Sequence, residues 1–203
     1  MFEIVQAAGW PIWFLLFASV IAVALIIERS VTLRSSRIIP PGLLDQVVSV
    51  VQRQGLSHDV IERLSRDSPL GAVLAAGLRN LKSSRYVMKE AIEEAGRGVA
   101  HELGRFLTTL GTIATAAPLL GLFGTVIGMI EIFGSQSPTG GTNPQQLAHG
   151  ISIALYNTAF GIALGIAALV FYRHFRAKVD TFVVEMEQLA AKLIDMVHGE
   201  RAA

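Results

Sequence analysis

The residues of this 203-residue chain that could do chemistry are uncharged polar side chains within long apolar runs. Residues 106–130 contain no charged side chain, yet they carry Thr108, Thr109, Thr112, Thr115 and Thr125. Residues 150–172 are also free of charge and carry Ser152, Tyr156, Asn157 and Thr158. A threonine can satisfy its hydroxyl against the preceding turn of its own helix. The amide of Asn157 is costlier in an apolar run, and such groups usually face a protein interface or a water-filled path.

Patterns typical of catalysis or metal binding are missing from the sequence. There is no cysteine, so the chain has no disulfide, no thiol nucleophile and no cysteine-ligated metal. The five histidines lie far apart, and neither an H-E-x-x-H motif nor a phosphate-binding loop is present. We therefore expect no enzymatic activity, no cofactor and no bound metal. A formal net charge of +1 is also too small to indicate a nucleic-acid partner.

The composition points to a membrane. Hydrophobic residues make up 52% of the chain, which excludes a disordered protein, and charged residues make up only 16%. A third charge-free run covers residues 4–27, and each run exceeds the roughly 20 residues that cross a bilayer. We predict an all-α integral membrane protein with transmembrane helices at 11–28, 106–132 and 147–172. The first is expected to stay as an uncleaved anchor, because its leader has Glu3 and lacks the basic residues of a signal peptide.

The positions of lysine and arginine predict the orientation of these helices. Twelve of the 17 basic residues lie in 29–105 and the other five in 173–203. Cytoplasmic segments carry such an excess, so both are expected inside. The predicted layout is a short external N-terminus (1–10), a cytoplasmic helical segment (29–105), an external turn (133–146) and a cytoplasmic C-terminal helix (173–203). Because no charged residue lies in the middle of a predicted span, any proton carrier at that depth must come from a partner.

Helical periodicity continues outside the predicted spans. Residues 43–54 and 59–66 read as short amphipathic helices, and Ser68 followed by Pro69 should begin a third helix over 70–81. Ser84 should cap the next one. An apolar stripe then runs through residues 88, 92, 95, 99, 103 and 106 with no breaker before the second span, so we predict one helix over 85–132. A similar stripe carries the third span on through 175–197, and we expect these extensions to pack together in one bundle.

Small residues recur along the second and third spans. Such stripes let two helix backbones approach closely in a membrane. Pro118 lies within the second span and removes one backbone hydrogen bond of that helix. The spacing leaves open whether the stripes join these two spans or serve another contact. The candidate packing residues are Pro118, Gly121, Gly124, Gly128, Ala154, Gly161 and Gly165.

Two motifs carry a family resemblance. Residues 117–129 read Ala-Pro-Leu-Leu-Gly-Leu-Phe-Gly-Thr-Val-Ile-Gly-Met, and residues 150–161 read Gly-Ile-Ser-Ile-Ala-Leu-Tyr-Asn-Thr-Ala-Phe-Gly. They resemble the second- and third-span signatures of the MotA/TolQ/ExbB proton-channel family. The predicted three-span layout is similar to its ExbB and TolQ branch, whereas motor stators of the family usually have four spans.

The resemblance implies a mechanism and partners. Members form homopentamers in the bacterial inner membrane, and their second and third spans line a pore. Two copies of a single-span partner of the ExbD or TolR type occupy that pore, and an aspartate of the partner takes and releases protons. The work reaches the cell envelope through a TonB- or TolA-like protein. Thr125 and Thr158 match the family's pore-facing threonines, so the resemblance implies that they line the ion pathway.

One position departs from the family pattern. Many relatives have a glutamate where this chain has Ile153, while Tyr156 and Asn157 replace residues that are usually apolar or small. Our hypothesis is that Tyr156 and Asn157 supply part of the missing polar lining. An alternative of a different class is a non-conducting membrane scaffold that assembles partner proteins through its cytoplasmic helices.

Overall fold

The computed structural model describes residues 9–54, 57–134 and 144–199, and every regular element in these ranges is an α-helix. The chain divides into two compact units. The first unit comprises Met1–Glu28 and Phe106–His174, and the second comprises Arg29–Arg105 and Phe175–Ala203. Each unit therefore combines segments that are far apart in the sequence.

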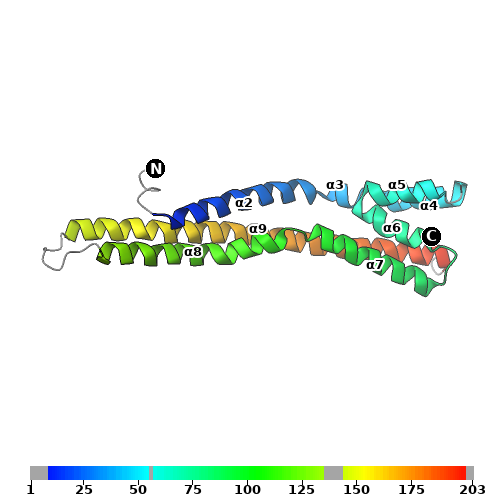
Figure 1. The fold of residues 1–203 in the computed structure, drawn as a ribbon. Coiled ribbons are helices and arrows are strands. Elements are labelled where there is room, and N and C mark those ends of the chain that lie inside the picture. The colour runs from blue at the N-terminus through cyan, green and yellow to red at the C-terminus, as the bar shows by residue number, and fades with distance from the viewer. Residues whose placement is uncertain (1–8, 55–56, 135–143, 200–203) are drawn as a thin grey trace. The chain divides into compact units, whose positions relative to one another are not determined.

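The first unit contains most of α2 (Pro11–Thr32), α8 (Leu107–Gly134) and the first part of α9 (Pro144–His198). All three helices contain a segment long and apolar enough to cross a membrane. This confirms the predicted fold class, an all-α membrane protein with three candidate spans. Figure 1 shows α8 and α9 running side by side in this unit.

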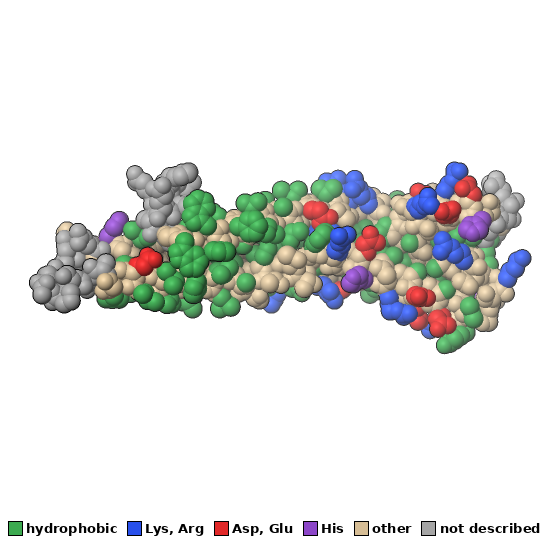
Figure 2. Space-filling model, in the orientation of Figure 1, with side chains coloured by type: hydrophobic (Ala, Val, Ile, Leu, Met, Phe, Trp, Pro, Cys, Tyr) green, Lys and Arg blue, Asp and Glu red, His purple; other side chains and the backbone are tan. Residues whose placement is uncertain are grey.

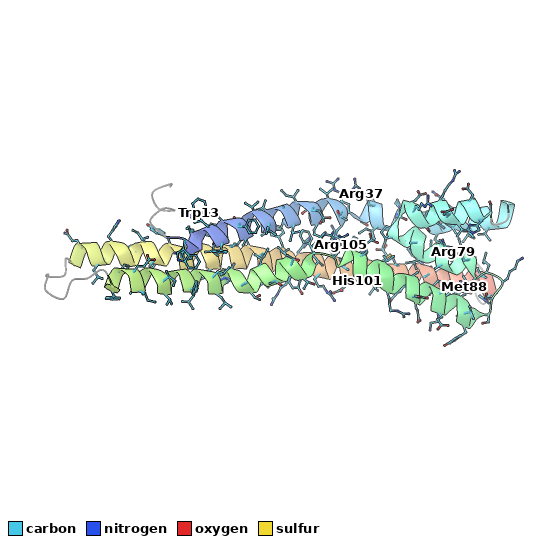
Figure 3. All side chains as sticks on the ribbon, viewed as in Figure 1. Trp13, Arg37, Arg79, Met88, His101 and Arg105 are labelled. Carbon is cyan, nitrogen blue, oxygen red and sulfur yellow. The ribbon has the colours of Figure 1, made fainter. Side chains whose placement is uncertain are left out.

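Large apolar side chains remain exposed on all three helices of the first unit. Phe17 of α2, Leu119 of α8 and Ile166 of α9 are examples. Figure 2 shows hydrophobic side chains covering the visible face of these segments. An apolar surface of this extent is a membrane or protein interface rather than a surface exposed to water. Trp13 lies in the first turn of α2 (Figure 3), and Trp10 directly precedes this helix. Amphipathic rings such as these favour the membrane boundary.

The second unit is a bundle of shorter helices packed on the rest of α9. It contains α3 (Ser35–Ile38), α4 (Leu43–Gln54), α5 (His58–Asp67), α6 (Pro69–Arg79) and α7 (Arg85–Leu103). Both predicted N-caps are confirmed. The Ser68 hydroxyl accepts from the backbone N–H of Gly71 at 3.0 Å, and the Ser84 hydroxyl accepts from that of Val87 at 3.4 Å.

The core of the second unit is built from the stripes that the sequence showed. Met88 and Ile92 of α7 are buried and reach the backbone of α6 at Gly77, where an added methyl group would lie 2.8 Å from Ile92 Cδ1 (Figure 3). In the part of α9 that belongs to this unit, the buried residues are Phe175, Val179, Phe182, Met186, Ala190, Leu193 and Ile194. The predicted continuation of the third span as one helix is confirmed, because α9 extends without a break to His198.

The predicted continuous helix over 85–132 is wrong. α7 ends at Leu103 and α8 begins at Leu107, with Phe106 in the left-handed region at φ 64°. The Gly104 N–H still bonds to Ala100, but the helix does not continue. The carbonyl of Leu103 instead accepts a hydrogen bond from Arg29 Nη1 at 3.0 Å, and the Arg29 side chain is only 4% exposed. A buried guanidinium from a distant segment thus satisfies a carbonyl that helix termination leaves without a helical partner.

Candidate functional site

The candidate site lies where α8 and α9 cross. At Gly121 an added methyl group would lie 2.6 Å from the Asn157 carbonyl oxygen and 3.0 Å from Thr158 Cα. At Gly161 it would lie 2.5 Å from the Ala117 carbonyl oxygen and 2.9 Å from Gly121 Cα. No real side-chain carbon fits at these distances. The two backbones touch here only because both positions are glycine.

The same close packing continues in both directions along the pair. Gly124 faces the Asn157 side chain, and Gly128 faces the methyl group of Ala154. At Gly165 an added methyl group would lie 2.6 Å from Cγ of Pro118, so this glycine makes room for the proline ring. The question that the sequence left open is therefore answered: the small residues of the second and third spans pack α8 against α9 of the same chain.

This packing brings two hydroxyl groups together. The side chains of Thr125 and Thr158 are half-buried, and their Oγ1 atoms are hydrogen-bonded to each other. Thr158 Oγ1 also lies 3.1 Å from the Gly121 carbonyl oxygen, and Thr125 Oγ1 lies 3.2 Å from the carbonyl oxygens of Gly121 and Ala154. A hydroxyl has one proton to donate and two lone pairs that accept. Each threonine can therefore engage a carbonyl or its neighbour and still accept from a further donor.

The contacts of Thr125 distinguish it from two exposed threonines earlier in α8. Thr112 Oγ1 donates to the Thr108 carbonyl at 2.9 Å, and Thr115 Oγ1 donates to the Thr112 carbonyl at 3.0 Å. Both bonds stay within one helix, as the sequence predicted for threonine in an apolar run. Thr125 bonds within α8 to Gly121 and also reaches across to α9, which makes the Thr125–Thr158 pair a feature of the tertiary structure.

Tyr156 and Asn157 are not brought together. Asn157 is fully buried (0% exposed) against Gly124, where an added methyl group would lie 2.9 Å from the asparagine Cβ and Cγ. Tyr156 is 46% exposed. Adjacent helical residues point about 100° apart, so the two side chains occupy different faces of α9. Their shared role in a polar lining stays a prediction, and the structure assigns Asn157 to the α8–α9 contact.

Sequence reasoning missed the ends of this contact. Gly111 packs against the ring of Tyr172, and Gly150 packs against Ile132. The signal was present, because Gly111 lies one helical turn before Ala114, and Gly150 lies one turn before Ala154. Among the residues that the structure describes, no group of three or more His, Asp or Glu side chains could hold a metal ion.

The comparisons with known proteins agree with this geometry. Residues 65–188 match the MotA/TolQ/ExbB proton channel family, and this match includes α8 and the crossing with α9. An ExbB-like biopolymer transport protein of Synechocystis is 32% identical over 165 residues, which are 80% of this chain and 79% of the relative. Biopolymer transport protein exbB1 of Vibrio cholerae is 28% identical over 174 residues, 82% of this chain and 75% of the relative.

A shorter match has a higher sequence identity. The biopolymer transport protein ExbB of Helicobacter pylori is 38% identical over 79 residues, which cover 39% of this chain and 54% of that protein. The match of the family to more than half of the chain agrees with the glycine-rich crossing, the two motifs and the three apolar helices. The chain is thus a multi-pass membrane protein that belongs to the MotA/TolQ/ExbB proton channel family, in its ExbB/TolQ-like branch.

Proposed function

We propose that this chain is the pore-forming subunit of a complex that uses the proton motive force to do work in the bacterial cell envelope. Five copies of the chain surround two copies of a single-span partner of the ExbD or TolR type. The complex lies in the inner membrane, with the N-terminus of this chain outside and its C-terminus in the cytoplasm. A TonB- or TolA-like protein passes the work on.

The observation that supports this proposal best is the Thr125–Thr158 pair. It is a polar contact between two helices that are free of charge over residues 106–130 and 150–172. The hydroxyls retain lone pairs that can accept a hydrogen bond from water or from a protonated carboxyl group. They do not titrate at neutral pH, so they can solvate a proton carrier but cannot replace it. The aspartate of the partner supplies that carrier.

The distribution of basic residues supports the orientation. No lysine or arginine lies in 1–28 or 106–172, and all 17 except Arg173 belong to the second unit. Figure 2 shows charged side chains gathered on the second unit, as expected for a segment surrounded by water. By the positive-inside rule, this distribution supports a cytoplasmic location for that unit.

Co-purification followed by a flux measurement tests the proposal. A one-span protein with an intramembrane aspartate, encoded beside this chain, is co-expressed with it, and the purified complex is reconstituted into vesicles that contain a pH-sensitive dye. A proton gradient should then collapse faster than in vesicles that hold this chain alone. A stable complex whose flux does not exceed that of empty vesicles would contradict the channel and favour the non-conducting scaffold.

A further inference from the structure

One face of α2 is exposed along the helix and consists of large apolar side chains. Val20, Val23, Ile27 and Val31 recur at three- and four-residue steps, so they form one stripe, and they are 40% to 67% exposed. Helices that meet other helices in a membrane use small residues at the contact, as α8 and α9 do. α2 contains no glycine, and its small residue Ala22 is buried. The bulky, β-branched stripe of α2 is therefore better suited to contact with lipid acyl chains.

Two arginines follow this stripe directly. Arg34 lies three residues after Val31, and Arg37 lies one turn further along, in α3. The Arg37 backbone N–H donates to the Arg34 carbonyl at 3.0 Å, and this turn brings the two side chains to neighbouring positions. Both residues are exposed, and Figure 3 shows the Arg37 side chain projecting outward. Two guanidinium groups therefore lie one turn apart, just beyond the end of the apolar stripe.

Within the described part of the chain, no carboxylate compensates these two charges. Elsewhere in the second unit, several basic residues pair with an acidic residue one turn away, as Arg63 does with Asp59 at 3.0 Å. Residues 30–41 contain no acidic residue, so Arg34 and Arg37 have no such neighbour. Neither forms an ion pair with any residue that the structure describes. The pair therefore presents two positive charges to whatever lies beside it.

A second pair of basic residues has the same spacing but a different setting. Arg79, the last residue of α6, and Lys82 are also three residues apart, exposed and without an ion pair among the described residues. However, α6 has 11 residues, too few to cross a membrane, and its larger apolar side chains are buried. An unpaired charge alone therefore does not distinguish Arg34 and Arg37. Their continuity with the exposed apolar stripe of a membrane-spanning helix does.

We propose that Arg34 and Arg37, together with the end of the α2 stripe, bind an anionic phospholipid of the surrounding membrane. The two guanidinium groups hold the headgroup phosphate, because arginine can donate two parallel hydrogen bonds to phosphate oxygens. The acyl chains of the same molecule lie along Ile27 and Val31. Basic clusters beside a span attract anionic lipids in this way. A zwitterionic lipid binds more weakly, because its own cation already compensates the phosphate.

Native mass spectrometry of the full chain in detergent tests the proposal. The protein is mixed with equal amounts of phosphatidylglycerol and phosphatidylcholine that have identical acyl chains, and the ratio of the two bound lipids is measured. The parent should favour phosphatidylglycerol. Arg34→Gln/Arg37→Gln should lower the ratio at least about tenfold, because two basic residues beside a membrane contribute this much or more. The matched control Arg79→Gln/Lys82→Gln removes the same charge and should leave the ratio within about twofold. An equal fall in both double variants, or no fall in either, would overturn the proposal.

Two further measurements separate the lipid from other occupants. Glycerol 3-phosphate carries a phosphate without acyl chains, and at the concentration of the lipid it should not displace phosphatidylglycerol. Displacement would show a site for soluble phosphate and would overturn the proposal. The mass of the assembly in lipid-free detergent should be the same for the parent and for Arg34→Gln/Arg37→Gln. A smaller assembly for this variant would identify acidic residues of a second copy of this chain as the counter-charge and would also overturn the proposal.

Discussion

At the scale of single residues, the polar site depends on two positions that have no side chain, Gly121 and Gly161. Thr158 can place its hydroxyl 3.1 Å from the Gly121 carbonyl oxygen only because Gly121 and Gly161 let the two backbones touch. The pair of hydroxyls and the pair of glycines are thus one arrangement. A change that separates the helices should weaken the site even where it leaves both threonines in place.

Gly161→Ala should destabilise the protein. The added methyl group would lie 2.5 Å from the Ala117 carbonyl oxygen, and a backbone atom cannot move aside as a flexible side chain can. Overpacking of this kind costs about 1–3 kcal/mol. The thermal unfolding midpoint in detergent, read from the loss of the monodisperse chromatographic peak, should fall clearly. The control is Ala163→Leu, which adds more volume at an exposed position of the same helix and should leave the midpoint unchanged. An equal fall in both variants would contradict this account.

Asn157→Leu separates the shape of this side chain from its polarity. Leucine has the same branching as asparagine, so it fits against Gly124 while removing the amide. The complex should still assemble, and ion-coupled function should be impaired. The measurement is proton flux through the reconstituted complex together with the yield of partner that co-purifies. Flux at the parental level would show that the amide has no part in the ion path.

At the scale of elements, the break between α7 and α8 depends on a contact between segments distant in sequence. Arg29 lies 74 residues before Leu103, whose carbonyl it binds. The positive guanidinium also lies at the negative end of the α7 dipole, which is a favourable position for a cation. The end of α2 and the end of α7 are therefore held together by one buried side chain.

Arg29→Met should loosen the end of α7. Methionine keeps much of the apolar stem but leaves a buried carbonyl without this donor, at a cost of about 1–3 kcal/mol. Amide hydrogen exchange at residues 100–106 should become faster. Arg34→Met is the control, because Arg34 is exposed and lies at the next arginine position in the chain. Exchange that is unchanged in Arg29→Met would contradict the capping role.

Features that depend on local spacing could be predicted from the sequence, whereas features that depend on long-range contacts could not. The caps at Ser68 and Ser84, and the continuation of α9, follow from local spacing and were predictable. The end of α7 was not, because Gly104 alone is a weak stop signal and the donor comes from Arg29. Spacing located the small residues but could not show which helix they contact. The sequence analysis also grouped Tyr156 with Asn157 in one polar lining, although consecutive residues of a helix point in different directions.

At the scale of the whole molecule, the two units differ in chemistry. The first has long, apolar helices with a polar contact between two of them, and the second carries every basic residue except Arg173. Such a division suits a protein in which one unit meets the bilayer and the other meets partners in water. Within the described residues, the Thr125–Thr158 contact is the polar feature on which the proposed ion pathway rests.

The central claim is that these two hydroxyls serve the ion path, and proton flux through the reconstituted complex tests it directly. Thr125→Val and Thr158→Val keep the branched shape and remove the hydroxyl, so each should lower the flux at least about tenfold, which corresponds to roughly 1.4 kcal/mol. Thr125→Ser and Thr158→Ser keep the hydroxyl and should retain most of the flux. The amount of co-purified partner should be the same in all four variants. Parental flux in both valine variants would contradict the claim.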